Sequence, residues 1–259
     1  MHALVDSHVH LDHAAFNADR AQVLARAQAN CIGTLVIPGV DRNGWASIRH
    51  LCAGNHRLHA AYGLHPLFAD QHAPNDVQAL SAWLDAGDAV AIGEIGLDFH
   101  AQSPDRDLQR HFFRAQLQIA RERGLPVIVH ARAAFEEVSL TLREVGGLRG
   151  VVHSFSGSQQ QASRLWELGF CLGIGGPVTY PRARRLRQIV ASMPSEFLLL
   201  ESDAPDQPDA GIRGQRNEPA RVADIACCIA ELRGETLSTL AAATTANARR
   251  VFGLDAKQD

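Results

Sequence analysis

The stretch from residue 89 to residue 132 contains a strand–helix–strand pattern that decides the fold class. It begins with AVAIGEIGLD (89–98), a short apolar run. DRDLQRHFFRAQLQIARERG (105–124) follows, with apolar residues at three- and four-residue spacing and Gly124 as a stop signal after two arginines. The second short apolar run is PVIVHAR (126–132). Nearly continuous apolar strands that alternate with helices are typical of a parallel sheet buried on both faces.

The same alternation continues along the whole chain. Eight short apolar runs, several of them β-branched, are separated by longer helical patterns; they span 3–9, 34–40, 58–65, 89–98, 126–132, 150–155, 171–176 and 197–205. Eight such βα units predict an α/β fold, a single (β/α)₈ barrel of the TIM type, and 259 residues is an ordinary length for one. A doubly wound open sheet is the alternative. Because no linker or repeat divides the chain, we expect one domain over 1–259, with its longest loop at 205–219.

The composition argues against a strongly basic DNA-binding protein, a membrane protein and a disulfide-stabilised protein. The formal net charge is −3, so no global positive field indicates tight electrostatic binding to DNA, although local contacts to phosphates stay possible. No apolar run approaches the roughly 20 residues of a membrane span, and no signal peptide is evident. The five cysteines are an odd number without CxxC spacing, which indicates free thiols in a reducing compartment. We expect a cytoplasmic protein with no membrane contact and no obligate protein partner.

Candidate metal ligands stand near the carboxyl ends of five of the predicted strands. In DSHVHLD (6–12), His8 and His10 share a face because strand side chains alternate. One such pair is weak evidence, but functional residues collect at the carboxyl strand ends of a barrel. The full set of candidates is His8, His10, Glu94, His130, His153 and Asp203. Six nitrogen or oxygen ligands exceed what one zinc ion takes and suit two ions about 3.5–4 Å apart.

The near-absence of lysine indicates which residue would bridge two ions. A related barrel design uses a carboxylated lysine on the fourth strand. Here the only lysine is Lys257, third from the end of the chain, whereas the fourth strand offers Glu94. Two divalent ions, two carboxylates and neutral histidines leave a charge of about +2 before a hydroxide is added. That charge favours an anionic reacting group such as a phosphodiester.

Further polar residues are candidates for supporting roles. His65, at the end of the third strand, suits a phosphate contact or proton donation; a structural histidine is the alternative. Arg132 lies two residues beyond His130 and suits a bidentate phosphate contact, or is a plain surface arginine. Asp6 and Glu201 lie deeper, where carboxylates either orient ligands or form structural salt bridges. RARRLRQ (182–188) could touch a nucleic-acid backbone, but a solvated helix face is the preferred interpretation.

The motifs together resemble the TatD family of metal-dependent deoxyribonucleases, and most closely its YjjV-like branch. The resemblance rests on DSHVHLD, GLHP, IGEIGLD, LPVIVHAR, VVHSFSG, GIGGPVTYPRA, LLLESDAP and RGQRNEP, in the order of the family, and extends from residue 4 to residue 254. It implies a metal-dependent barrel hydrolase that acts on DNA, often from a 3′ end, with the six ligands at the positions given above and a phosphate-side histidine at His65. Relatives that deacylate aminoacyl-tRNA leave the bond that is broken undetermined.

Our hypothesis is a deoxyribonuclease that cleaves phosphodiester bonds with a bridging hydroxide in a two-metal site, most readily at single-stranded or frayed 3′ ends. Asp203 would also be the general base, and His65 and Arg132 would hold the phosphate. One ion would be held by His8, His10 and Asp203 and the other by His130 and His153, with Glu94 between them. Zn²⁺, Mn²⁺, Ni²⁺ or Fe²⁺ suit these ligands, Mg²⁺ less typically. A binuclear amide or ester hydrolase and a non-catalytic metal-binding interaction protein are the alternatives.

Overall fold

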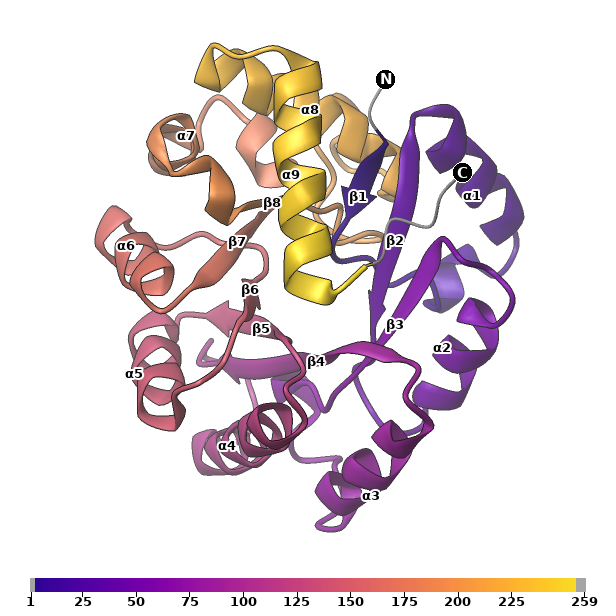
Figure 1. Cartoon of the computed structure of the whole chain (residues 1–259), viewed down its shortest axis with the longest axis vertical. Coiled ribbons are helices and arrows are strands. Elements are labelled where there is room, and N and C mark those ends of the chain that lie inside the picture. Colours follow the sequence, from indigo (N-terminus) through magenta and orange to yellow (C-terminus); the bar gives the residue numbers. More distant parts are fainter. Residues whose placement is uncertain (1–2, 255–259) are drawn as a thin grey trace.

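A computed structural model describes residues 3–254, which form one barrel of eight parallel strands surrounded by helices (Figure 1). The strands are β1 (Leu4–Asp6), β2 (Ile32–Pro38), β3 (Leu58–Tyr62), β4 (Ala89–Asp98), β5 (Val127–Arg132), β6 (Gly150–Val152), β7 (Phe170–Ile174) and β8 (Leu198–Leu200). They pair in the order of the chain, from β1 to β8. The predicted (β/α)₈ barrel is confirmed. A doubly wound sheet is wrong, because its strand order would reverse.

The helices α1 to α7 lie outside the sheet between successive strands, and α8 and α9 follow β8. Their bounds are α1 (Arg20–Ala29), α2 (Trp45–Cys52), α3 (Asp76–Trp83), α4 (Arg106–Arg123), α5 (Phe135–Val145), α6 (Gln159–Glu167), α7 (Arg184–Ser192), α8 (Val222–Arg233) and α9 (Leu237–Phe252). The helix predicted over 105–124 is α4. It begins where the Asp105 carboxylate accepts hydrogen bonds from the Asp107 and Leu108 N–H groups, and it ends at Gly124, which has a φ of 64°.

The barrel closes through segments just beyond the first and last strands. The Ser7 N–H donates to the Leu200 carbonyl at 2.9 Å, and the Asp203 N–H donates to the His8 carbonyl at 2.9 Å. The first predicted run was 3–9, but β1 ends at Asp6, because the backbone beyond it bonds alternately to two neighbours. The histidines at 8 and 10 therefore follow the strand, in the closing segment.

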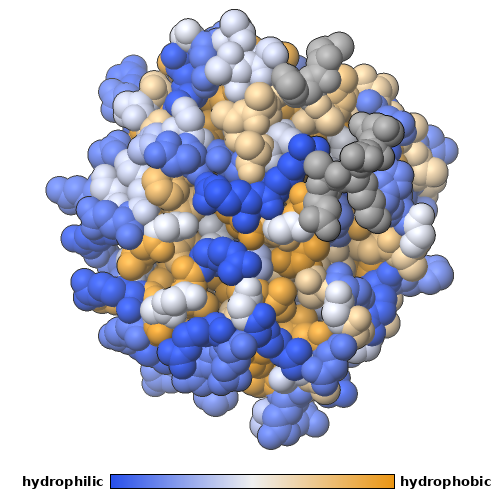
Figure 2. Space-filling view, viewed as in Figure 1, coloured by the Kyte–Doolittle hydropathy of each residue, from blue (hydrophilic) through white to orange (hydrophobic). Residues whose placement is uncertain are grey.

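The lower half of the barrel interior is apolar and is covered by α9. Each strand contributes one side chain to this layer: Val5, Val36, Ala61, Ala91, Ile128, Val151, Cys171 and Leu199. Val251 and Phe252 of α9 pack against it, and Figure 1 shows α9 lying across this end of the barrel. In Figure 2 hydrophilic residues dominate the rim of the same view, where the outer helices lie. The opposite end, at the carboxyl ends of the strands, is therefore the open one.

Within residues 3–254, no helix is long and apolar enough to cross a membrane. The cysteines at 31, 52, 171, 227 and 228 form no disulfide. Lys257 lies outside the described residues.

Candidate metal centre

A cleft of about 520 Å³ opens at the carboxyl ends of the strands and collects the predicted site residues. Five of the six predicted ligands line it, namely His10, Glu94, His130, His153 and Asp203, together with His65 and Arg132. His8 lies behind them with no exposed surface. The structure thus brings together every residue that the strand-end pattern selects.

Four of these side chains form a first cluster with the spacing of metal ligands. His8 Nε2 lies 3.2 Å from His10 Nε2, 3.2 Å from Glu94 Oε2 and 3.5 Å from Asp203 Oδ1. His10 Nε2 lies 3.5 Å from Glu94 Oε2 and 3.6 Å from Asp203 Oδ1. Donors about 2.0–2.1 Å from a central ion in a tetrahedron would be about 3.3 Å apart. The donor atoms of this cluster therefore fit one divalent ion.

A second cluster faces the other oxygen of the Glu94 carboxylate. Oε1 of Glu94 lies 2.9 Å from His130 Nδ1 and 2.7 Å from His153 Nε2, and these two nitrogens are 3.3 Å apart. Three protein donors leave coordination positions for water and substrate, as in catalytic metal sites. Because its two oxygens face different clusters, Glu94 has the geometry of a carboxylate that bridges two ions.

An irregularity in β4 turns Glu94 into the barrel. Ala91 belongs to the inner layer, so strict alternation would point residue 93 inward and residue 94 outward. The pairing of β4 with β5 shifts register between Ile92 and Ile95, and the Glu94 side chain is 2% exposed inside the site. Such irregularities re-aim side chains next to active sites.

Asp98, which the sequence analysis missed, holds His130 from behind. Its Oδ2 lies 3.0 Å from His130 Nε2, while its Oδ1 accepts hydrogen bonds from the Ser103 hydroxyl at 2.6 Å and the His100 N–H at 2.9 Å. Burial raises the pKa of Asp98, but these hydrogen bonds outweigh it and lower the pKa overall. An ionised Asp98 accepts a hydrogen bond from the protonated Nε2 of His130, so the Nδ1 lone pair faces Glu94 and the second cluster.

We expect Asp98→Asn to weaken metal binding about 10- to 100-fold. The two donors at Oδ1 would keep the asparagine oxygen on their side, so its NH₂ group would face His130 Nε2 and force the proton onto Nδ1. Competition with a chromophoric chelator measures the affinity. Ser103→Ala is the matched control, because it removes one donor but keeps the carboxylate. Equal affinities for wild type and Asp98→Asn would contradict this role.

His65 lies beside the second cluster but has the wrong tautomer for a ligand. Its Nδ1 accepts a hydrogen bond from the Leu67 N–H at 3.1 Å, so the neutral ring carries its proton on Nε2. That Nε2 lies 3.0 Å from Glu94 Oε1. His65 is therefore placed as a hydrogen-bond donor at the cleft, which agrees with the predicted phosphate contact or proton donation better than with a seventh ligand.

The predicted phosphate-binding residue Arg132 stands at the edge of the cleft. Its side chain is 55% exposed, and its guanidinium lies 3.8 Å from Asp98 Oδ2, too far for a hydrogen bond. Because this contact leaves the donors of the guanidinium available, an anion in the cleft has access to them.

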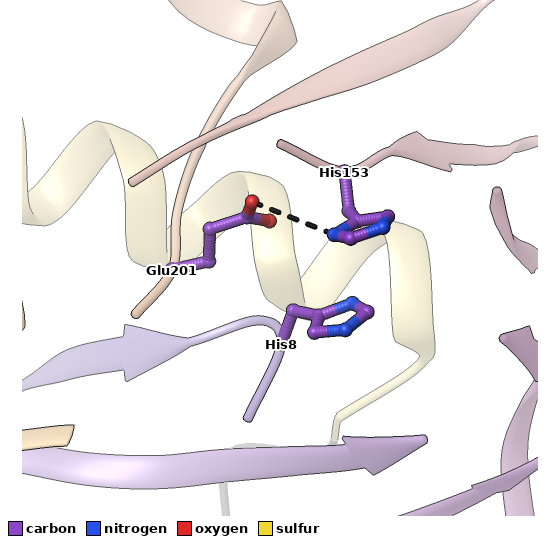
Figure 3. A group of neighbouring side chains, drawn as sticks. All are labelled: His8, His153 and Glu201. Carbon is purple, nitrogen blue, oxygen red and sulfur yellow. Dashed lines mark ion pairs between the residues drawn. The ribbon is translucent and has the colours of Figure 1, made fainter. Parts of the chain in front are cut away.

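Glu201 and Asp6 lie below the clusters, as their positions in the sequence suggested. Glu201 Oε1 accepts a hydrogen bond from the Ser154 N–H at 2.5 Å and lies 3.8 Å from His153 Nδ1, the contact dashed in Figure 3. Asp6 accepts hydrogen bonds from the Ser202 N–H at 2.9 Å and the Ser202 hydroxyl at 2.6 Å, and so ties β1 to the segment after β8. Burial raises the pKa of Glu201 to about 8 and that of Asp6 to about 7.

A third ion between His8, His153 and Glu201 is not expected, although one donor atom of each lies within 4.8 Å of the others (Figure 3). Nε2 of each histidine already faces Glu94, and a neutral imidazole has a single lone pair. The two rings stack with their centroids 3.9 Å apart. At 3.8 Å from His153 Nδ1, too far for a hydrogen bond, Glu201 is an electrostatic partner of that ring rather than a metal ligand. Gly173 provides its space, since a Cβ there would lie 1.9 Å from Glu201 Oε2.

Gln207 positions Asp203, a role that no motif in the sequence indicated. Gln207 Nε2 donates to Asp203 Oδ2 at 2.5 Å and contacts Ser154 Oγ at 2.6 Å. All three residues have positive φ, between 47° and 54°, a conformation that is uncommon for non-glycine residues and that clusters at functional sites. With Oδ2 held by Gln207, Oδ1 is directed at the first cluster.

Binding of an ion to His153 should release a proton. Burial opposes the charged imidazole, but the carboxylates of Glu94, Glu201 and Asp203 raise the pKa of His153 to about 10 in the metal-free protein. The ion needs the lone pair that this proton occupies, so metal affinity should rise with pH up to about 10. Calorimetric titrations at pH 8 in buffers of different ionisation enthalpy should give about one proton fewer for His153→Asn than for wild type. Equal release would contradict the assignment.

Comparisons with known proteins agree with this geometry. The family model of TatD related DNase matches residues 5–253. An uncharacterized metal-dependent hydrolase, YjjV of Escherichia coli K12, is 37% identical over 253 residues, which cover 96% of this chain and 98% of that protein. The 3′-5′ ssDNA/RNA exonuclease TatD of Citrobacter rodentium is 34% identical over 98% of this chain and 99% of its own. The crystal structure of E. coli YjjV superimposes with a TM-score of 0.93 at 35% identity, covering 96% of this chain and 98% of that one.

Proposed function

The chain belongs to the TatD-related DNase family and is a metal-dependent hydrolase, and from this premise we propose that it cleaves phosphodiester bonds in DNA, at single-stranded or frayed 3′ ends. The observation that carries the proposal is the Glu94 carboxylate, whose two oxygens face separate clusters of ligand atoms. The Citrobacter relative is named an exonuclease for single-stranded DNA and RNA, which supports the choice of substrate.

The donor sets fit two divalent ions. His8, His10, Asp203 and Glu94 Oε2 would hold one, and His130 Nδ1, His153 Nε2 and Glu94 Oε1 the other. When bound, such ions neutralise the charge of the phosphate and supply a nucleophile from water at neutral pH. Nitrogen-rich ligation suits Zn²⁺, Mn²⁺, Ni²⁺ or Fe²⁺ better than Mg²⁺.

The chain's own residues would then bind the phosphate and move the protons. Asp203, whose Oδ1 is directed at the first cluster by Gln207, would take the proton from the attacking water. The Nε2–H of His65 would donate to a phosphate oxygen or to the leaving group, and the exposed fork of Arg132 would bind a phosphate in a bidentate manner. The cleft walls also include Leu67, Phe68, Phe155 and Pro177, apolar surface against which a nucleobase can pack.

A panel of substrates tests the proposal. We expect metal-loaded protein to hydrolyse a single-stranded oligonucleotide with kcat/KM well above that for an aminoacyl ester, an amide or an intact blunt duplex. His65→Ala and Arg132→Ala should lower kcat/KM for the oligonucleotide. Preferred turnover of the ester or amide would overturn the nuclease assignment and leave a metal-dependent hydrolase that acts on carbonyl groups.

A further inference from the structure

The surface beside the cleft contains a group of arginines without carboxylate partners. Eleven of the 24 arginines lie within 4 Å of a carboxylate oxygen, for example Arg26 beside Glu218 and Arg221 beside Asp209. Arg182, two residues before α7, and Arg184, the first residue of α7, have no carboxylate oxygen within 4 Å among residues 3–254, and both are exposed. On a chain with a net charge of −3, this is a local excess of positive charge.

This positive surface is continuous with the cleft. A shallow second hollow is lined by Pro177, Tyr180, Arg182, Ala183, Gln207 and Pro208. Pro177 and Gln207 also line the main cleft, so the two hollows share a wall. Leu186 of α7 lines the main cleft as well. A chain that leaves the cleft on this side therefore passes over the hollow and the first turn of α7.

Tyr180 provides a fixed aromatic ring in the second hollow. Its hydroxyl donates to the Pro208 carbonyl at 2.9 Å, which holds the side chain against the 205–209 segment. The Arg182 guanidinium carbon lies 5.3 Å from the ring centroid. An aromatic ring beside an unpaired arginine is the combination that binds single strands, because the ring stacks on a base of any sequence and the guanidinium pairs with a phosphate.

We propose that the hollow formed by Tyr180 and Arg182, together with Arg184, is a subsite for a single-stranded nucleic acid, and that it binds nucleotides beyond the two that flank the scissile phosphate in the cleft. The proposal rests on the proposed nuclease function for its orientation toward the cleft. The six residues of the hollow include no carboxylate, so nothing in its lining repels a phosphate. The first N–H groups of α7, which have no carbonyl partner within the helix, add donors on the same side. The 182–188 run, interpreted from sequence as a solvated helix face, thereby gains a binding role.

The test compares a dinucleotide with a 12-residue single strand of the same 3′ end. The double variant Arg182→Gln/Arg184→Gln should raise KM for the 12-residue strand at least tenfold while leaving kcat/KM for the dinucleotide within twofold of wild type. Its binding should also depend less steeply on salt, with a slope smaller by about 1.4 for two lost phosphate contacts on a single strand. Tyr180→Leu should weaken binding of the longer strand, and Tyr180→Phe, which keeps the ring, should retain most of it.

The matched control is Arg143→Gln/Arg149→Gln, which removes the same charge from the opposite end of the barrel. Both arginines are exposed; Arg143 lies in the last turn of α5 and Arg149 just before β6. We expect this control to behave as wild type toward both substrates. Equal loss in the two double variants would mean that only net charge matters and would overturn the subsite.

A binding measurement separates failure of the subsite from failure of the nuclease function. Fluorescence anisotropy with a cleavage-resistant phosphorothioate strand reports affinity without turnover. If wild type cleaves no oligonucleotide but Arg182→Gln/Arg184→Gln still weakens this affinity, the subsite stands and the nuclease function falls. If wild type cleaves and the double variant binds and cleaves the 12-residue strand as wild type does, the subsite falls. If polyglutamate at equal charge concentration displaces the strand, the surface binds acidic proteins rather than nucleic acid, and the assignment is overturned.

Discussion

Glu94→Ala is expected to abolish metal-dependent hydrolysis while the barrel stays folded. The substitution removes one oxygen from each cluster, so the ions would lose the only side chain shared by both donor sets. It also removes the negative charge that lies between the two donor sets, so the repulsion between two bound cations is no longer offset. We expect metal-stimulated turnover below detection, with far-UV circular dichroism close to that of wild type.

Two further variants make the result specific. Glu94→Gln keeps one oxygen in place but loses the negative charge, so we expect it to bind at most one ion. Glu122→Gln removes the same charge from an exposed position on α4 and should behave as wild type. Metal content after dialysis, measured by mass spectrometry, distinguishes the three proteins. Full activity in Glu94→Ala would show that Glu94 is not a required metal ligand.

Asp203→Asn should lower kcat by about 10²- to 10⁴-fold, the usual contribution of a positioned general base. Asp203 is directed at the first cluster by a 2.5 Å hydrogen bond from Gln207, and an amide in its place cannot accept the proton of water. Asp206→Asn is the control, because it removes a carboxylate from the wall of the same cleft outside both clusters.

The metal dependence of the Asp203→Asn variant separates its two proposed roles. If Asp203 is a base, kcat stays low when the metal concentration is raised to saturation. If Asp203 is a ligand only, excess metal restores kcat. A variant that turns over as fast as wild type at low metal concentration would contradict both roles.

The sequence predicted the barrel and the gathering of six ligand candidates, for one physical reason. The carboxyl ends of parallel strands meet at one end of a closed sheet, so polar residues at strand ends that are far apart in the chain become neighbours. His8 and Asp203, 195 positions apart, illustrate this, with Nε2 and Oδ1 3.5 Å apart. The barrel fold alone therefore brings these side chains together.

The orientation of Glu94 and the roles of Asp98 and Gln207 depend on local backbone geometry, which the alternation of strand side chains does not predict. Glu94 faces inward only because the β4–β5 register shifts between Ile92 and Ile95. Asp98 was missed, although its place four residues after Glu94, at the end of the same strand, was a usable signal. Its role needs the pairing that sets β4 beside β5 and brings it to His130. Gln207 contacts Asp203 because both residues have positive φ, and no sequence pattern predicts that backbone conformation here.

The most direct test of the two-cluster centre is cleavage of a 5′-labelled single-stranded oligonucleotide by metal-stripped protein, with Mn²⁺, Zn²⁺ or Mg²⁺ added back. We predict no cleavage without metal, a ladder that shortens from the 3′ end once about two ions per chain are bound, and no ladder from Glu94→Ala under the same conditions. Full cleavage by the metal-stripped protein in excess chelator, or an unchanged ladder from Glu94→Ala, would contradict the account.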